Sequence, residues 1–253
     1  MRKRIAIVGD DPSFNEAIGR AVEGKPVILS ALEGDSPPPA TSAVVGPAPQ
    51  AELLVNAALS AGDEHSALFL LVGDAVAVRE DIPLGSSKRV LGHATRLAEA
   101  LGLSEDEQLA LERAAVLRDI GKLRINNDLL LKKNVLDYDE WHLLQNHAVM
   151  GAELLEEWGV CADVLSAIRY HHECYDGDGY PEGLEKDQIP MLARAVKIID
   201  VYCAMTSPRH YRPTYADQDQ ARQHLKNERG KHFDPEMIDA FISNHVARQL
   251  EEG

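Results

Sequence analysis

The sequence predicts a mainly helical protein that begins with a small α/β unit. Residues 1 to about 80 contain short β-rich runs separated by helix-like or Pro-rich segments, an alternation that favours a parallel sheet. After Gly85 these runs end, and apolar residues recur at the three- and four-residue spacings of amphipathic helices. We therefore expect a small α/β domain over residues 1–80 and a helical domain over residues 84–253.

The β-rich runs are the expected strands of the first domain. They are IAIVG at 5–9, PVILSAL at 26–32, SAVVG at 42–46 and ALFLLVG at 67–73.

Capping residues divide the second part of the chain into helices. The first helix has one apolar face, formed by Val90, Leu97 and Leu101. A capping box of Ser104 and Glu107 opens a second helix, which is expected to run to Arg118. Asp137 and Glu140 open a third, which is expected to continue until a glycine at 159 stops it. Further helices are expected at 161–172, 190–206 (after Pro190), 215–228 and 234–250.

The composition excludes several classes of partner and location. A formal net charge of -15 and a pI near 5.1 argue against binding to DNA, RNA or an anionic membrane, because these need clustered Lys and Arg. Three irregularly spaced cysteines give neither a disulfide framework nor a CxxC zinc site, which fits a reducing cytoplasm. The first apolar run is too short for a signal peptide, and no stretch is expected to span a bilayer.

A few polar residues interrupt the apolar helix faces. Asp200 lies within a stripe of Leu192, Val196, Ile199 and Cys203, and a buried carboxylate needs a cation or a metal as its partner. His147 lies between apolar positions, where a lone histidine is more often a hydrogen-bonded core residue than a ligand. His171 and His172 end the next helix, and by themselves they are equally well explained as surface residues.

The segment HHECYDGDGYPEGLEKDQIPMLARAVKIIDVYCAMTSPRHYRP, 171–213, resembles the signature region of the HD-GYP family, a subgroup of the HD superfamily. DIGK at 119–122 matches the second half of the family's HD-x-G-K motif, and His147 with Gly151 matches its H-x-x-x-G helix. The resemblance covers roughly residues 84–250.

That resemblance implies an all-helical domain whose ligands hold iron or manganese and which hydrolyses the bacterial messenger cyclic di-GMP. By position, one metal would be held by His147, His171 and His172, with Asp119 bridging and Asp200 belonging mainly to a second metal. Asp119 and Lys122 are the expected catalytic residues. The residues expected to face the nucleotide are Lys122, Gly179, Tyr180, Pro181, Arg209 and Arg212.

The departures from the family pattern concentrate on the second metal. Ser86 stands where the family has a histidine, and Arg118 replaces the histidine of the HD pair. A further family carboxylate falls on Ile82, and Cys203 replaces an aspartate. His93 is a weak substitute for the lost imidazoles, because two helical turns displace it by about 10 Å.

Two interpretations of Arg118 follow. A buried guanidinium could neutralise Asp119 and Asp200 and repel an entering cation by about 4 kcal/mol per pair at ~4 Å and an effective dielectric of ~20. Alternatively, Arg118 could point to solvent at the helix end, where a positive charge suits the helix dipole.

The first domain resembles a response-regulator receiver that has lost its chemistry. Gly9 replaces one residue of the acidic pair, Asp10 remains, and no aspartate follows the third expected strand as phosphoacceptor. A docking or dimerisation module is the expected role, with a signalling protein as partner and a homodimer as an open option.

Three functions remain open from the sequence. The first is a degenerate HD-GYP protein that lacks efficient turnover and acts as a cyclic-di-GMP receptor or interaction partner. The second is an active metal-dependent phosphodiesterase, and the third is a protein scaffold that binds no nucleotide. Because the second metal position has lost its imidazoles, we expect at most one tightly bound transition metal, iron or manganese, or none.

Overall fold

The computed structural model describes residues 3–7, 27–31, 64–80, 82, 85–157, 160–207 and 215–252. Strand β1 (Lys3–Ile7) pairs in parallel with β2 (Val27–Ala31), and Lys3 lies opposite Val27. Both segments were predicted as strands, and this prediction is confirmed. The strand expected at 42–46 lies outside the described residues.

Helix α3 (Glu64–Val78) contains the run 67–73, so the prediction of a strand there is wrong. A short apolar run fits either a buried strand or a buried helix, and this one is part of a longer segment that forms a helix. Gly73 allows close packing, since a Cβ atom there would lie 2.6 Å from Ser87 Oγ and 2.7 Å from a Val116 methyl. Contacts of α3 with the next two helices favour including it in the helical domain, whereas the division at residues 80–84 stays a prediction.

The next elements are α4 (Ser86–Leu101), α5 (Glu105–Leu117), the 3-10 helix η1 (Ile120–Arg124) and α6 (Asn127–Leu130). The capping box of Ser104 and Glu107 is present at the start of α5, as predicted. Helix α4 ends at Gly102, whose φ of 65° is the left-handed conformation that favours glycine.

The third predicted helix is two helices, α7 (Tyr138–Gln145) and α8 (His147–Glu157). Its capping box of Asp137 and Glu140 is confirmed, but α7 ends at Asn146 and the prediction of one continuous helix is wrong. At this break the His147 ring bonds to the Leu144 carbonyl, a local contact that apolar spacing does not reveal.

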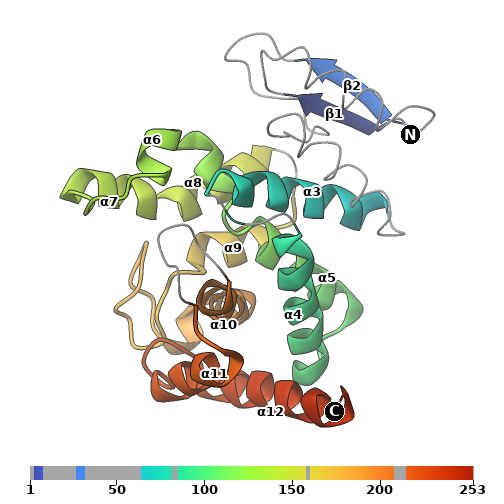
Figure 1. The fold of residues 1–253 in the computed structure, drawn as a ribbon, viewed down its shortest axis with the longest axis vertical. Coiled ribbons are helices and arrows are strands. Elements are labelled where there is room, and N and C mark those ends of the chain that lie inside the picture. The colour runs from blue at the N-terminus through green and yellow to red at the C-terminus, as the bar shows by residue number, and fades with distance from the viewer. Residues whose placement is uncertain are drawn as a thin grey trace.

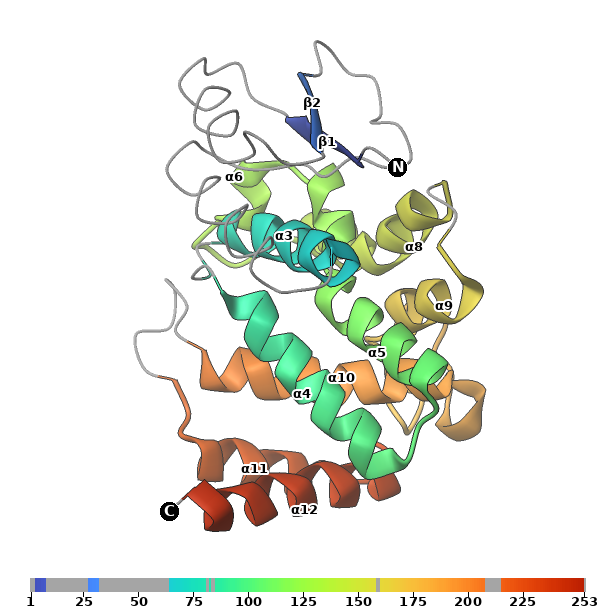
Figure 2. The same cartoon turned by 90° about the vertical axis from the view of Figure 1, so that its right-hand side faces the viewer.

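The remaining elements confirm the other predicted helices. They are α9 (Ala162–Tyr170), the 3-10 helix η2 (Lys186–Gln188), α10 (Met191–Thr206), α11 (Gln218–Asn227) and α12 (Pro235–Glu252). Helix α10 is central, in contact with α4, α5, α9, α11 and α12. In both ribbon views α11 and α12 lie at the end of the molecule opposite α3 (Figures 1 and 2).

The mainly helical fold class is therefore confirmed. The largest fully buried side chains belong to its helices and connecting turns, and they include Tyr202, Phe233, Phe241, Leu97, Leu111 and Ile168. Within the described part of the chain, no helix combines the length and apolar character needed to cross a membrane.

Candidate metal centre

Two histidines at helix ends are oriented by backbone carbonyls. His147 begins α8, and its Nδ1 lies 2.6 Å from the Leu144 oxygen. His171 follows α9, and its Nδ1 lies 2.6 Å from the Ile168 oxygen. Because a carbonyl oxygen only accepts, each Nδ1 donates its proton and leaves the Nε2 lone pair free. This is how a protein orients imidazole as a metal ligand.

Three imidazoles converge on one point. One ligand nitrogen from each of His147, His171 and His172 lies within 4.8 Å of the others, and the Nε2 atoms of His147 and His172 are 3.3 Å apart. The Nε2 of His171 is fully buried and has no hydrogen-bond partner among the described residues. A buried unpaired nitrogen is costly, and a metal ion at this point would satisfy it. Asp119 Oδ1, 3.5 Å from His147 Nε2, would supply a fourth ligand.

Burial keeps the three histidines neutral. It lowers the pKa of His171 to about 3, and it also lowers the pKa of His147 and of His172, with the neighbouring imidazoles acting in the same direction on His171 and His172. Neutral imidazole is the form that binds a metal. The donor set of three nitrogens and one carboxylate suits a divalent transition metal such as iron, manganese or zinc.

Arg118 lies beside this cluster, at the C-terminal end of α5. Its Nε is 2.7 Å from Asp200 Oδ1 on α10, and its Nη2 is 3.3 Å from Asp119 Oδ2. Its Nη1 donates to the Ala115 carbonyl at 2.8 Å. The side chain is buried, with 9% of its residue surface exposed. The interpretation of Arg118 as a solvent-facing charge is therefore wrong, and its contacts match the expected pairing with both carboxylates.

The ion pairs shift the pKa of each partner. Burial lowers the pKa of Arg118, but the charges of Asp200 and Asp119 outweigh it and raise that pKa. Burial raises the pKa of both aspartates, and nearby cations outweigh it, mainly Lys122 and Arg118 for Asp119 and mainly Arg118 for Asp200. All these groups are therefore charged near neutral pH.

Lys122 adds a second cation. Its Nζ lies 2.8 Å from Asp119 Oδ1 and 2.9 Å from Glu80 Oε2. Burial lowers its pKa, and the charges of Asp119 and Glu80 outweigh this and raise it. Two fixed cations thus lie among three carboxylates, at a place where the family resemblance implies a second metal. Glu80 was missed from the sequence, where nothing marks it except its carboxylate.

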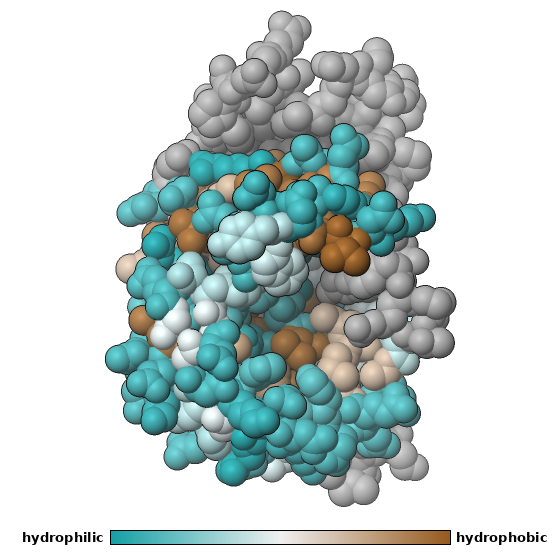
Figure 3. All heavy atoms as spheres, turned by 90° about the vertical axis from the view of Figure 1, so that its left-hand side faces the viewer, coloured by the Kyte–Doolittle hydropathy of each residue, from teal (hydrophilic) through white to brown (hydrophobic). Residues whose placement is uncertain are grey.

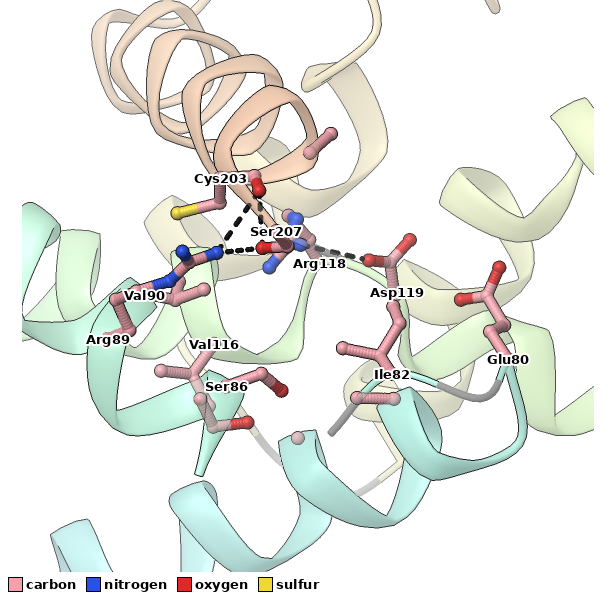
Figure 4. A pocket seen from close by; sticks show the side chains of 14 residues that line it. Glu80, Ile82, Ser86, Arg89, Val90, Val116, Arg118, Asp119, Cys203 and Ser207 are labelled. Carbon is pink, nitrogen blue, oxygen red and sulfur yellow. Dashed lines mark hydrogen bonds and ion pairs between the residues drawn. The ribbon is translucent and has the colours of Figure 1, made fainter. Parts of the chain in front are cut away.

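Both positions of lost histidines line the same small cavity. Ser86, Arg118, Asp119, Ile82 and Cys203 are among the residues around a space of about 40 Å³ (Figure 4). The structure therefore brings together the positions that the departures from the family pattern single out. His93 lines neither this cavity nor the larger one described below, and its ring packs edge-on against Tyr202 at 5.0 Å.

Ser86 is hydrogen-bonded to a carboxylate of the neighbouring helix α3. Asp74 on α3 accepts hydrogen bonds from the Ser86 hydroxyl at 3.3 Å and from the Ser87 and Gly85 backbone at 2.8 and 3.0 Å. This buried carboxylate therefore caps the start of α4 from a neighbouring helix. It was also missed from the sequence, because the contact depends on how α3 packs.

The loop with Gly179, Tyr180 and Pro181 is held against the histidines. The Tyr180 ring stacks on His172, with centroids 4.7 Å apart and planes inclined by 20°. A side chain at Gly179 would lie 2.4 Å from the Glu173 Cα, so only glycine allows this approach. Glu173 in turn accepts hydrogen bonds from the backbone of Glu182, Gly183 and Leu184.

A larger cavity of about 580 Å³ opens beside the metal site. Asp119, Lys122, His147, His172, Tyr180 and Asp200 are among its lining residues. The structure thus brings most of the expected site residues to one place, while Arg209 and Arg212 lie outside the described residues. Its other lining residues, most of which belong to α6, α7 and the turn between them, were not expected from the sequence.

Known proteins are similar to this chain in both sequence and fold. A family model described as an HD domain matches residues 71–237. The cyclic di-GMP phosphodiesterase response regulator RpfG of Xanthomonas campestris pv. campestris is 41% identical over 159 residues, covering 62% of this chain and 41% of that protein. The 3′3′-cGAMP-specific phosphodiesterase 2 of Vibrio cholerae is 30% identical over 195 residues, covering 75% of this chain and 37% of that protein. The chain therefore spans about two fifths of the length of these relatives.

Two solved structures show the same fold. A cyclic GMP-AMP-specific phosphodiesterase of V. cholerae superposes with a TM-score of 0.56 at 20% identity, over 74% of this chain and 49% of that one. An HDG"Y"P protein of Bdellovibrio bacteriovorus superposes with a TM-score of 0.53 at 16% identity, over 92% of this chain and 78% of that one. With the matched family model and the motifs described above, the chain belongs to the HD-domain family, in its HD-GYP branch.

Proposed function

We propose that this chain is a catalytically impaired HD-GYP protein that binds cyclic di-GMP and acts as a receptor or interaction partner. The observation that carries the proposal is the guanidinium of Arg118, which is bonded to both Asp119 and Asp200. In the family pattern these two carboxylates would serve a second metal. Here their charges are already neutralised by a group that belongs to the chain.

Electrostatics supports the loss of the second metal. A guanidinium at ~4 Å repels each unit of cationic charge by about 4 kcal/mol at an effective dielectric of ~20. The neighbouring residues do not compensate, because Ser86 bonds to Asp74 and Ile82 offers no ligand atom. Burial also raises the pKa of the Cys203 thiol, which disfavours the thiolate that binds a metal.

The other metal position keeps its ligands. His147, His171, His172 and Asp119 would hold one transition metal, which when bound would polarise a phosphate oxygen and acidify a water molecule. Asp119 also bonds to Lys122 and Arg118, so its orientation is fixed by two cations. We expect at most one tightly bound metal per chain.

Cyclic di-GMP is the proposed ligand because the cavity combines cations, an aromatic ring and a metal site. Lys122 and Tyr180 line it, and Gly179 and Pro181 belong to the same loop as Tyr180. Arg209 and Arg212 are three residues apart, a spacing that allows two guanidinium contacts to a phosphate. The volume of about 580 Å³ falls within the roughly 300–1,000 Å³ of small-molecule sites.

An active phosphodiesterase is the second candidate. It is favoured by the retained set of four metal donors. It is also favoured by the similarity of the chain to proteins named as phosphodiesterases of cyclic di-GMP or 3′3′-cGAMP. In that case a single metal, with Asp119 and Lys122 beside it, would be sufficient for hydrolysis.

One pair of measurements separates these functions. Metal-loaded protein is incubated with cyclic di-GMP and the products are separated by chromatography, and binding is measured in parallel by calorimetry. The receptor proposal predicts binding at micromolar concentrations with turnover near background. Efficient turnover would establish the enzyme instead, and no binding at tens of micromolar would leave only a protein scaffold.

We also propose that the amino-terminal part contacts a signalling protein. This rests on the resemblance to a receiver domain without a phosphoacceptor, and the two parallel strands β1 and β2 are compatible with it. Such a module should take no phosphoryl group from acetyl phosphate, which intact-mass spectrometry would test.

A further inference from the structure

The segment that contains α6 and α7 contributes a large part of the lining of the 580 Å³ cavity. Its lining residues are Leu129, Leu130, Lys132, Lys133, Leu136, Trp141, Leu144 and Gln145. The same cavity is lined by His147, His172 and Tyr180, which belong to the metal site and its loop. The lining from this segment is mainly apolar, with one indole and two lysines, whereas Asp119, Lys122 and Asp200 make the rest of the lining ionic.

Trp141 is the most distinctive lining residue of this segment. It is 49% exposed, although tryptophan is highly buried on average. It projects from α7, whose start is held by the Asp137 and Glu140 capping box. An indole that faces a cavity from a capped helix is available for stacking with a planar ligand.

The two lysines differ in their partners. Lys132 forms an ion pair with Glu140, so its charge is already compensated. Among the residues that the structure describes, no carboxylate is in ion-pair distance of the exposed Lys133. Lys133 is therefore the lysine of this pair that is free to contact an anionic group of a ligand at the cavity.

We propose that Trp141 and Lys133 form a second subsite, which holds the base and phosphate of a cyclic dinucleotide that are farther from the metal centre. This inference rests on the proposed function and extends it. A cyclic dinucleotide has two phosphates and two bases, so a site that contacts one phosphate at the metal leaves the other half to be bound elsewhere. An aromatic platform with a nearby cation is the usual way to bind a base and its phosphate.

Stacking predicts a particular specificity. Every nucleobase has a π-face, so an indole platform tolerates guanine and adenine alike. The contribution of Trp141 should therefore be the same for cyclic di-GMP and for 3′3′-cGAMP. Any discrimination between these ligands must come from other residues.

Several exposed apolar side chains lie near this subsite in the sequence but do not line the cavity. They are Leu131, Val135, Tyr138 and Leu143. On the face in Figure 3, hydrophobic side chains gather in patches around a hollow within a mostly hydrophilic surface. Tyr138, which is 75% exposed on the same helix, provides a matched aromatic control.

The test compares Trp141→Ala, Trp141→Phe and Lys133→Ala with Tyr138→Ala and the unchanged protein. Calorimetry measures binding of cyclic di-GMP and of 3′3′-cGAMP, and metal content and thermal unfolding confirm that each variant is intact. We expect Trp141→Ala to weaken the binding of both ligands on the order of 10-fold. Trp141→Phe should retain most of the affinity, Lys133→Ala should weaken it several-fold with a reduced salt dependence, and Tyr138→Ala should change nothing.

The outcomes separate this inference from the proposed function. If the unchanged protein binds neither ligand, the receptor function and the subsite are both wrong. If it binds and Trp141→Ala binds equally well, only the subsite is wrong. If Trp141→Ala does not fold, the other two variants test the subsite. Unchanged ligand affinity in Lys133→Ala, together with a tenfold loss of affinity in Tyr138→Ala, would overturn the subsite and assign the effect to the surface of α7.

Discussion

The Nε atom of Arg118 lies 2.7 Å from Oδ1 of Asp200, although the two residues are 82 positions apart in the chain. This contact joins the end of α5 to the middle of α10 beside the three-histidine cluster. The same guanidinium also reaches Asp119, so a single side chain pairs with two carboxylates. We expect this contact to affect both the stability of the fold and the binding of a second cation.

Removal of the guanidinium should destabilise the fold. Arg118→Ala leaves Asp119 and Asp200 as buried charges that have lost a partner, which costs about 3–5 kcal/mol in the free energy of unfolding. Urea denaturation would measure this. The control is Arg229→Ala, which removes an exposed pair with Asp239 and should cost at most about 1 kcal/mol. Equal stability of both variants would show that the Arg118 pairs contribute little.

The same variant should respond to metal. Without Arg118, Asp200 loses its guanidinium partner and Asp119 keeps Lys122, so these carboxylates can bind Mn²⁺ more readily. Any ion that binds the folded state raises its stability. We expect Mn²⁺ to raise the melting temperature of Arg118→Ala more than that of the unchanged protein. Equal shifts would mean that Arg118 does not control access of a cation.

Restored imidazoles should restore the second metal. Ser86→His with Arg118→His places two histidines at the small cavity beside Asp119 and Asp200, while each single change leaves a ligand missing or a repelling charge. We expect the double variant to gain a metal and measurable hydrolysis of cyclic di-GMP, with both singles near background. A double variant that binds two metals and the nucleotide yet stays inert would refute the idea that only ligands were lost.

The remaining metal should depend on the buried histidines. His171→Ala removes a nitrogen that has no other partner among the described residues, so the metal content should fall close to zero. Elemental analysis would measure it. His142→Ala on α7 is the matched control, since His142 is exposed, packs edge-on against Tyr138 and does not belong to the histidine cluster. Full metal content in His171→Ala would exclude this cluster as the binding site.

The arginine pair should contribute to nucleotide binding. Arg209→Ala should weaken cyclic-di-GMP binding by about 1–3 kcal/mol, the loss expected for a charge-assisted hydrogen bond. Calorimetry would measure this against Arg124→Ala, which removes a surface pair with Glu153. Unchanged affinity in Arg209→Ala would exclude the phosphate contact.

Local signals in the sequence predicted most of the helical domain. The capping boxes at Ser104 and Asp137 depend on residues three positions apart, so they were correct at both helix starts. The run 67–73 was predicted as a strand because a short apolar segment has no period that separates a buried helix from a buried strand. The break at Asn146 was missed for a similar reason, since apolar residues continue at helical spacing on both sides of it.

Only the site residues that belong to sequence motifs were predicted. The motifs identified His147, His171 and His172, whose ligand atoms lie within 4.8 Å of one another, and Asp119, which lies 3.5 Å from His147. The partners Glu80 and Asp74 were not predicted, because each contacts the site through the packing of α3 or the turn that follows it. Trp141 was not predicted as part of the site, since its position at a cavity depends on where α7 lies.

The number of metal ions bound per chain shows whether Arg118 excludes a second metal. The unchanged protein is purified without oxygen and supplied with iron or manganese, and the metal bound per chain is measured after removal of excess ions. Because Arg118 already neutralises Asp119 and Asp200, we expect at most one tightly bound metal per chain. Two tightly bound metals per chain, together with efficient hydrolysis of cyclic di-GMP, would show that Arg118 does not exclude the second metal.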